Sequence, residues 1–214
     1  MTLASTASLS KRDEKAWLRD RLRRLRAEQG FPVGSAESMA AAAQVASAVL
    51  SLPSVARAQS VAVYEARGRE LDPSLLVSML GADTIVCYPR VASMNPPTLT
   101  FHVTSRSALR PSGFDLLEPG STEPLAPSID VFVVPGLGFD RSGRRIGQGK
   151  GFYDATLRMS PSAVRVGIGY DFQLISEIPV ESCDEPVDFV ITPTQKLATG
   201  ARASVLRFAE EDVS

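Results

Sequence analysis

Segments that favour β-strands alternate with segments that favour α-helices along most of the chain, and this alternation restricts the fold more than any other feature. Strands are expected at residues 60–64, 84–89, 98–103, 130–135, 164–170 and 188–192. Helices are expected at residues 11–26, 36–52, 72–80 and 152–159. Strands separated by helices form a mainly parallel sheet that is covered on both faces. The sequence therefore predicts an α/β fold.

The length of the chain fits a single domain. Its 214 residues compare with roughly 100 to 200 residues for a typical domain. We expect this domain at residues 11–192, with a disordered tail at 1–10 and a C-terminal tail at 193–214. Residues 36–52 form the most apolar stretch, which is Ala-rich and shorter than the roughly 20 apolar residues of a membrane-spanning helix. No membrane segment is expected.

Charge and cysteine content exclude several classes of function. A net charge of -1 gives no global basic field, so no nucleic-acid partner is expected. Cys87 and Cys183 form no CxxC motif, and His102 is the single histidine, which excludes a zinc site built from Cys and His. Both thiols are expected to be reduced, as in a cytoplasmic protein.

The segment from Gly136 to Gly151 contains six of the 15 glycines of the chain. It follows an expected strand and leads into an expected helix, which is where open α/β sheets bind ligands. Glycine lets the backbone come close to a ligand, and the interleaved Arg144, Arg145 and Lys150 favour an anion. The spacing matches neither a P-loop nor a dinucleotide-binding motif. A flexible surface loop is the alternative interpretation.

The first expected helix concentrates positive charge. It contains eight basic and three acidic residues, a net charge of +5. Lys15, Arg19, Arg23 and Arg26 form one stripe at helical spacing, which could bind an anion or be an ordinary solvated face. Arg26, at the end of the stripe, is expected to contribute little to anion binding. Trp17 is the one aromatic residue of this helix, so we expect it to anchor the helix and disfavour RNA binding.

Three acidic residues lie near these basic segments. Asp154 falls in the first turn of the helix that follows the glycine segment, where it can either hold a magnesium ion together with phosphates or complement the helix dipole. Asp184 precedes the last expected strand. Glu70 follows an expected strand and is either a ligand for a polar group or an ordinary loop acid.

Five sequence blocks resemble, in the same order, the 5-formyltetrahydrofolate cyclo-ligase family. The longest is VPGLGFDRSGRRIGQGKGFYDATL at residues 134–157. The others are KAWLR at 15–19, YEARGRELDP at 64–73, VCYPRV at 86–91 and IPVESCDEPVDFVIT at 178–192. A match to one glycine-rich loop would be unspecific, whereas five ordered blocks are specific.

The resemblance implies a single α/β domain similar to ribose-phosphate isomerase and glucosamine-phosphate deaminase. It implies an enzyme that converts 5-formyltetrahydrofolate and MgATP to 5,10-methenyltetrahydrofolate, ADP and phosphate by way of a phosphorylated formyl oxygen. ATP is the implied co-substrate and Mg²⁺ the implied metal. Phosphoryl transfer requires positioning and charge compensation, which glycine amides and basic side chains supply.

The resemblance also implies a role for individual residues. The implied ATP-binding residues are Lys15, Arg19, Arg145, Ile146, Gly147, Gln148, Gly149, Lys150, Gly151, Phe152 and Tyr153. The implied folate-binding residues are Glu70, Gln148, Gly149, Lys150, Gly151 and Phe152. Asp154 and Asp184 are the implied magnesium ligands, and Arg145, Lys150 and Tyr153 are implied to be catalytic.

Three positions depart from the family pattern. Phe152 replaces a frequent Tyr, and Cys183 stands where many members have His or Trp; neither change removes a charge that the chemistry needs. Ala155 replaces an Arg of many bacterial members, which would weaken phosphate contacts. Two other functions stay open: a non-catalytic sensor of nucleotides or sugar phosphates, and a paralogue that uses ATP on another substrate. A monomer is expected.

Overall fold

A seven-stranded mixed sheet forms the centre of the computed structural model, which describes residues 10–113 and 116–203. Its strands are β1 (Ser60–Ala62), β2 (Ile85–Met94), β3 (Pro97–Val103), β6 (Val131–Val134), β9 (Val164–Ile168), β11 (Phe189–Ile191) and β12 (Lys196–Ala198). They lie in the order β12-β11-β9-β6-β1-β2-β3. Neighbours from β11 to β2 are parallel, and the edge strands β3 and β12 are antiparallel. The expected mainly parallel sheet is confirmed.

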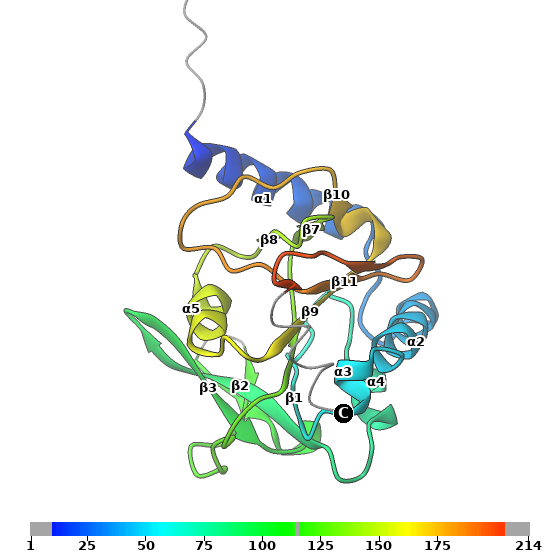
Figure 1. Ribbon diagram of the computed structural model, residues 1–214, viewed down its shortest axis with the longest axis vertical. Helices are drawn as coiled ribbons and strands as arrows, with labels where there is room; N and C mark the ends of the chain where they lie inside the picture. The colour runs from blue at the N-terminus through cyan, green and yellow to red at the C-terminus, as the bar shows by residue number, and fades with distance from the viewer. Residues whose placement is uncertain (1–9, 114–115, 204–214) are drawn as a thin grey trace, which may run out of the picture.

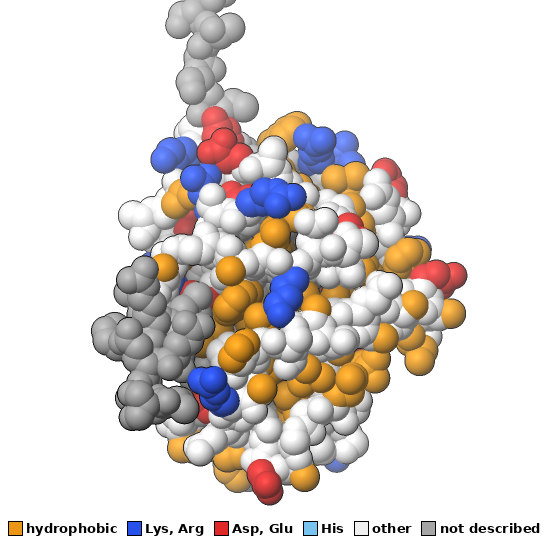
Figure 2. Space-filling view, turned by 45° about the vertical axis from the view of Figure 1, so that its right-hand side comes forward, with side chains coloured by type: hydrophobic (Ala, Val, Ile, Leu, Met, Phe, Trp, Pro, Cys, Tyr) orange, Lys and Arg blue, Asp and Glu red, His pale blue; other side chains and the backbone are white. Residues whose placement is uncertain are grey.

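Helices cover both faces of this sheet (Figure 1). The helices are α1 (Lys11–Gln29), α2 (Ala36–Leu50), α3 (Pro53–Ala56), α4 (Ser74–Met79) and α5 (Phe152–Met159), with 3₁₀ turns at Arg106–Ala108 and Asp171–Gln173. Helices α2, α3 and α4 lie on one side of the sheet, α5 lies on the other, and α1 crosses one end of the molecule (Figure 1). On the face shown in Figure 2, Lys and Arg side chains gather over the end where α1 lies, and hydrophobic side chains are more frequent over the rest.

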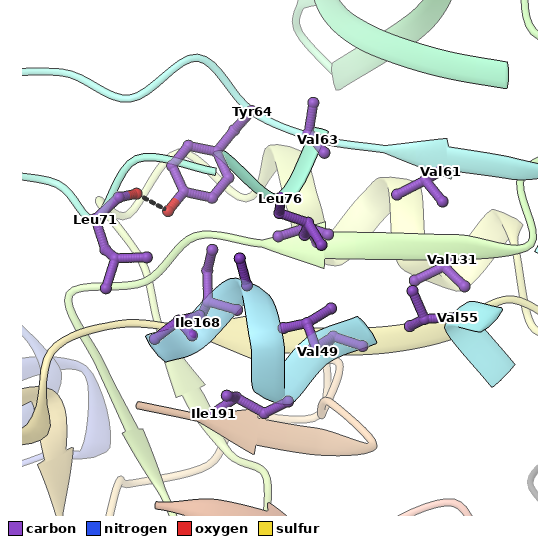
Figure 3. Close-up of a cluster of buried hydrophobic side chains, with 14 of the residues drawn as sticks. Val49, Val55, Val61, Val63, Tyr64, Leu71, Leu76, Val131, Ile168 and Ile191 are labelled. Atoms are coloured by element: carbon purple, nitrogen blue, oxygen red, sulfur yellow. Dashed lines mark hydrogen bonds between the residues drawn. The ribbon is translucent and has the colours of Figure 1, made fainter. Parts of the chain in front are cut away.

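The largest core cluster lies between the sheet and helices α2 and α4 (Figure 3). Small and β-branched side chains dominate it, because short side chains let a helix approach the sheet closely. Val49 of α2 and Leu76 of α4 are at most 2% exposed and pack with Val61 and Val131 of the sheet. The polar atom of Tyr64 is satisfied within this cluster, since its hydroxyl donates to the carbonyl of Leu71.

A second, three-stranded sheet was not predicted. It consists of β7 (Gly138–Asp140), β8 (Arg145–Ile146) and β10 (Leu174–Ile175), and its first two strands lie inside the glycine segment. That segment is therefore not a continuous flexible loop. Leu18 and Leu22 of α1 pack on this sheet in a cluster with Leu137, Ile146 and Ile178. The small sheet thus seats the basic helix above the carboxyl ends of the central strands.

Several boundaries differ from the expectation. Helix α1 ends three residues later than expected, and α4 begins at Ser74, whose N–H donates to Asp72, so Pro73 precedes the helix. The region after residue 103 forms a two-stranded ribbon from β4 (Arg110–Pro111) and β5 (Leu117–Glu118), and residues 114–115 lie outside the described structure. Strand β12 lies beyond residue 193 and joins the central sheet, so the chain contributes to the fold past the expected domain end.

The expected anchoring role of Trp17 is wrong. Its side chain is 60% exposed and lies under the Arg21 guanidinium, 5.5 Å from the ring centroid. The leucines of α1 supply the buried face instead. Within the described ranges, no helix combines the length and the apolar character needed to cross a membrane. Of the expected tails at 1–10 and 193–214, residues 1–9 and 204–214 lie outside the described residues.

Candidate active site

A cavity of about 870 Å³ lies where α1, the small sheet, α5 and the β2–β3 hairpin meet. All residues that the sequence singled out for ATP, folate or magnesium line it: Lys15, Arg19, Glu70, residues 145–154 and Asp184. These residues come from four separate parts of the sequence. The fold therefore brings the predicted site residues together in one cavity.

Lys15 is the most buried cation of the basic stripe. Its side chain is 3% exposed, and its ammonium forms ion pairs with Asp184 and with Oε2 of Glu181 at 2.8 Å. Burial acts to lower the pKa of Lys15, but hydrogen bonds and charges from Asp184 and Glu181 outweigh it and raise the pKa above that of an ordinary lysine. Lys15 is thus a fixed positive charge at the cavity wall.

The other members of the stripe also contact the site. Arg19 Nε donates to the Gly147 carbonyl at 3.2 Å, and Arg23 Nε donates to the Gln148 side chain at 3.3 Å. Arg26 Nη1 donates to Oε1 of Glu70 at 3.0 Å. The interpretation of the stripe as a plain solvated face is wrong, because these side chains reach partners far along the chain. Arg26 pairs with Glu70, the acid expected to contact folate, and its small contribution to anion binding stays a prediction.

The end of the glycine segment turns tightly beneath α1. Gly149 and Gly151 have positive φ angles of 93° and 76°, which favour glycine. A Cβ atom on Gly149 would lie 3.3 Å from Nε of Arg19, so this position also permits close contact with the helix. Gly151 precedes the first residue of α5, which places Lys150 and the N-terminus of α5 at the cavity. Backbone amides at such a helix start favour anions.

Arg145 and Asp154 form an ion pair across the turn. Arg145 Nη2 donates to Oδ1 of Asp154 at 2.8 Å, and the Arg145 side chain is 5% exposed. The guanidinium lies 5.8 Å from the centroid of the Tyr153 ring. Arg145 Nε and the Tyr153 hydroxyl are buried without a hydrogen-bond partner among the described residues. Such atoms carry a desolvation cost that a bound ligand can relieve.

Tyr153 is a neutral hydroxyl at physiological pH. Burial raises its pKa; the Arg145 charge opposes that shift and Glu70 adds to it, so the pKa stays far above neutrality. The hydroxyl can therefore donate a hydrogen bond to a ligand oxygen. Ile146, by contrast, is 1% exposed and packs against α1, and its carbonyl already accepts a hydrogen bond from the Leu137 N–H at 2.7 Å.

Among residues 10–113 and 116–203, hydrogen bonds are made to only one carboxylate oxygen of Asp154 and one of Asp184. Arg145 and the Glu185 N–H, at 3.3 Å, both donate to Oδ1 of Asp154. Lys15 and the Glu181 N–H both donate to Oδ2 of Asp184. No three His, Cys, Asp or Glu side chains of the described chain are grouped to hold a metal. The two acids thus match an ion shared with ligand oxygens, as Mg²⁺ prefers, better than a site made wholly of protein.

One wall of the cavity was missed by the sequence analysis. The β2–β3 hairpin contributes Val91, Met94 and Leu99 to the lining, and Phe152 faces the same cavity. These apolar side chains line the same cavity as the basic side chains of α1. Glu181 was also missed, although it stands three residues before Asp184 in the block that carries the resemblance. Its acidic side chain beside a buried lysine is recognisable only in the folded chain.

Comparisons with known proteins identify the family of this chain. The 5-formyltetrahydrofolate cyclo-ligase family matches residues 8–193 of the chain. A 5-formyltetrahydrofolate cyclo-ligase of Escherichia coli K12 is 32% identical over 186 residues, which cover 83% of this chain and 97% of the relative. One from Mus musculus is 26% identical over 202 residues, covering 88% and 96%.

A solved structure supports the same assignment. The 5,10-methenyltetrahydrofolate synthetase of Aquifex aeolicus superposes with a TM-score of 0.71 at 26% identity, over 86% of this chain and 92% of the other. The resemblance on which the site residues were chosen is confirmed at the level of the family, and the α/β fold is confirmed with it. The chain is an enzyme that belongs to the 5-formyltetrahydrofolate cyclo-ligase family.

Proposed function

We propose that the chain uses MgATP to cyclise 5-formyltetrahydrofolate to 5,10-methenyltetrahydrofolate, with release of ADP and phosphate. One observation carries this proposal: a single cavity is lined by the basic face of α1, the glycine turn and Glu70. The cavity of about 870 Å³ falls within the usual range of roughly 300 to 1,000 Å³ for small-molecule sites. It has a charged wall for phosphates and an apolar wall for flat rings.

The charged wall is the proposed ATP site. Lys15 and Arg19 from α1 face Lys150 and the backbone of residues 146–151, so a triphosphate between them meets cations on both sides. Arg145 contributes a further buried charge. Cations and amide dipoles that are already in place stabilise charge that moves during phosphoryl transfer. Glu181 gives Lys15 a second partner and so keeps it oriented at the edge of this site.

Asp154 and Asp184 are the proposed magnesium ligands, each through the oxygen that the described contacts leave available. A magnesium ion bound there supplies Lewis-acid neutralisation of the phosphate oxygens. The residues fit this role because Mg²⁺ is usually held by one or two carboxylates together with substrate phosphates and waters. Arg145 and Lys15 orient the two carboxylates from their other oxygens.

The apolar wall is the proposed folate site. The hairpin side chains Val91 and Leu99 can pack against the rings, and Glu70 can accept hydrogen bonds from ring N–H groups. Arg26 holds Oε1 of Glu70, so the carboxylate points in a fixed direction. Gln148 and Phe152 lie between the two walls and would meet both substrates.

The proposed chemistry activates a poor leaving group. The formyl oxygen attacks the γ-phosphorus of ATP, the bond to the β-phosphate oxygen breaks, and ADP leaves. N10 of the folate then attacks the formyl carbon, which carries the phosphorylated oxygen. N10 loses its proton, the bond from this carbon to that oxygen breaks, and phosphate departs with the original formyl oxygen. Arg145 Nε and the Tyr153 hydroxyl, which have no hydrogen-bond partner among the described residues, are the proposed donors to the transferring group. Lys150, which is exposed at the cavity, is proposed to neutralise the charge of the phosphate that is transferred.

An absorbance assay at the methenyl-folate band tests the proposal. Purified protein should form product from 5-formyltetrahydrofolate when ATP and Mg²⁺ are both present, and omission of either should stop it. A non-hydrolysable ATP analogue is the matched control. Folded protein that binds ATP but gives no product above background would contradict the proposal and favour a nucleotide sensor. Turnover of ATP with another amide in place of the folate would favour a paralogous activity.

The setting of the reaction is part of the proposal. We infer a monomeric cytoplasmic enzyme that acts on a small molecule and has no nucleic-acid partner. Cys87 and Cys183 are unpaired, and burial raises the pKa of the Cys87 thiol to about 11, so this thiol stays protonated. Light scattering and fractionation of cells test the oligomeric state and the location.

A further inference from the structure

Glu185 connects the two acids of the proposed metal site. Its Oε1 accepts a hydrogen bond from Arg158 at 3.1 Å, and its Oε2 accepts one from Arg165 at 3.0 Å. Its backbone N–H donates to Oδ1 of Asp154 at 3.3 Å. Because Glu185 directly follows Asp184 in the chain, one residue links Asp154 on α5 to the segment that carries Asp184.

Arg165 is the buried partner of Glu185. It lies on the central strand β9, and its side chain is 2% exposed. Nη1 also donates to the Pro186 carbonyl at 3.1 Å, and Nη2 donates to the Leu157 carbonyl at 2.5 Å. One guanidinium therefore joins α5, which carries Asp154, to the chain beside Asp184. The planar fork of an arginine suits such a multiple connection, which a lysine cannot reproduce.

Burial of the Arg165 guanidinium has a desolvation cost. Arg165 Nε is buried without a partner among the described residues, and a buried ion pair often adds little to stability compared with an apolar replacement. Neither Arg165 nor Glu185 lines the cavity. Any effect of this pair on the reaction must therefore pass through the residues that it holds in place.

We propose that Arg165 and Glu185 are positioning residues that fix the carboxylates of Asp154 and Asp184 relative to each other, so that both can share one magnesium ion. The inference rests on the proposed MgATP-dependent function. Contacts behind metal ligands commonly change metal affinity by about 10- to 100-fold when they are removed. The connection between the two acids runs through Glu185, and Arg165 anchors it to the rigid centre of the sheet.

The chain offers a matched control for a purely structural role. Arg202 is also a largely buried arginine, and it pairs with Asp188 at 3.1 Å, close to Arg165 in the same layer. Its other hydrogen-bond partners are the carbonyls of Ala163 and Pro161, so it donates no hydrogen bond to residues 183–186, although its charge also acts on Glu185 at longer range. Asp188 Oδ2 also accepts the Arg165 backbone N–H, which no side-chain substitution at Arg165 removes. Loss of Arg202 therefore disturbs packing without releasing Glu185.

The test compares Arg165→Gln, Glu185→Gln and Arg202→Gln with the original protein. Calorimetric titration of ATP at several magnesium concentrations gives the magnesium level for half-maximal nucleotide binding, and the absorbance assay gives kcat and the KM for folate. We expect Arg165→Gln and Glu185→Gln to raise this magnesium level about tenfold, with an unchanged KM for folate. Arg202→Gln should lower the melting temperature without ligand but leave the magnesium level unchanged. Arg165→Lys should lie between Arg165→Gln and the original protein.

Two results would overturn the inference. One is a folded Glu185→Gln variant that needs the same magnesium concentration for half-maximal nucleotide binding as the original protein. Glu185 is more exposed than Arg165, so its substitution disturbs folding less. The other is a rise in this magnesium concentration in Arg202→Gln as large as that in Glu185→Gln, which would show a general loss of packing. Failure of the proposed function is distinguishable, since it would appear in the original protein as magnesium-independent nucleotide binding or as absence of product.

Discussion

The two faces of the central sheet are built from different contacts. On the α2 and α4 face, the buried cluster consists of aliphatic and aromatic side chains, and the hydroxyls of Tyr64 and Tyr170 donate hydrogen bonds to the Leu71 carbonyl and to Ser38. On the α5 face and at the adjoining end of the sheet beneath α1, apolar residues share the interior with buried ionic groups. Those groups are Lys15, Asp140, Arg145, Arg165 and Asp188.

This difference separates stability from function within one domain. Burial of apolar surface stabilises the fold at roughly 25 cal/mol per Å² and needs no defined orientation. Ion pairs contribute little net stability when both partners are buried, but they fix the direction of each charge. We therefore expect substitutions on the α2 and α4 face to change melting, and those on the α5 face to change binding and turnover.

The largest expected effect is that of Asp154→Asn. The substitution keeps the size of the side chain and a hydrogen bond to Arg145, but it removes the proposed metal ligand. Turnover should fall by orders of magnitude and the magnesium requirement should rise, whereas the melting temperature without ligand should change little. Kinetics at several magnesium concentrations and thermal melting measure these quantities.

Asp184→Asn extends the same test. If both acids hold one ion, the double variant should lose far less than the sum of the single losses. If Asp154 only complements the helix dipole, Asp154→Asn should lower the free energy of unfolding by at most about 1 kcal/mol and leave turnover near normal. Near-normal turnover of Asp154→Asn with an unchanged magnesium requirement would refute the metal assignment and leave the family membership intact.

Leu76→Ala should have the opposite profile. Leu76 is 2% exposed in the cluster between α4 and the sheet, so its truncation leaves a cavity. The free energy of unfolding should fall by about 2 to 5 kcal/mol, as measured by urea denaturation. At temperatures well below melting, kcat and both KM values should be unchanged. A loss of turnover in the folded variant would show that the two faces are not separable.

Lys15→Ala and Arg19→Ala should weaken ATP binding by about 1 to 3 kcal/mol each, as expected for charge-assisted hydrogen bonds. Lys15→Ala should also cost stability, because it leaves Glu181 and Asp184 facing each other without a cation. Arg24→Ala is the matched control, since Arg24 lies exposed on the same helix outside the cavity lining. Equal, small effects of all three on calorimetric ATP affinity would argue against phosphate binding by α1.

Arg26→Ala should have a smaller and more selective effect. Its ion pair with Glu70 is partly exposed, and such pairs are worth no more than about 1 kcal/mol. The KM for folate should rise by a few-fold and the affinity for ATP should stay the same. Steady-state kinetics with each substrate varied in turn give the KM values for folate and for ATP. A change in the KM for ATP alone would assign Glu70 to the ATP site and not to the folate site.

The smallest expected effect concerns pH. Because Asp184 and Glu181 raise the pKa of Lys15, the folded protein holds this proton more tightly than the unfolded chain. The resulting stability is complete below the ordinary lysine pKa of about 10.4 and is lost as pH rises through the higher folded-state pKa. Urea denaturation from pH 8 to 11 should therefore show a stability gap between the original protein and Lys15→Met that narrows at the alkaline end. A constant gap would contradict the ion-pair explanation.

The sequence predicted the central strands and the long helices because their patterns are local. Val131–Val134 and Val164–Ile168 are continuous buried runs, and α1 repeats its leucines at helical spacing. The small sheet escaped prediction because its strands are two or three residues long and lie in a glycine-rich segment. No local pattern marks such short pairings.

In the site, too, local motifs were predictable and contacts between distant segments were not. Residues within a motif, such as Arg145 and Asp154, could be named from the sequence through the resemblance. Their partners could not: Lys15 and Asp184 are 169 residues apart, and their contact depends on the seating of α1 on the small sheet. The apolar wall from Val91 and Leu99 was missed because alternating residues of a long hairpin give no sign of which face meets a ligand.

The exposed position of Trp17 has a consequence for spectroscopy. The chain has one tryptophan, and it lies on α1 between Lys15 and Arg19 with Arg21 over its ring. Intrinsic fluorescence excited at the indole band therefore reports the surroundings of this helix and not those of the core. Binding at the proposed nucleotide site, which α1 lines, should be visible in this signal without a label. Unfolding is better followed by circular dichroism, since an indole that is already 60% exposed changes little when the core melts.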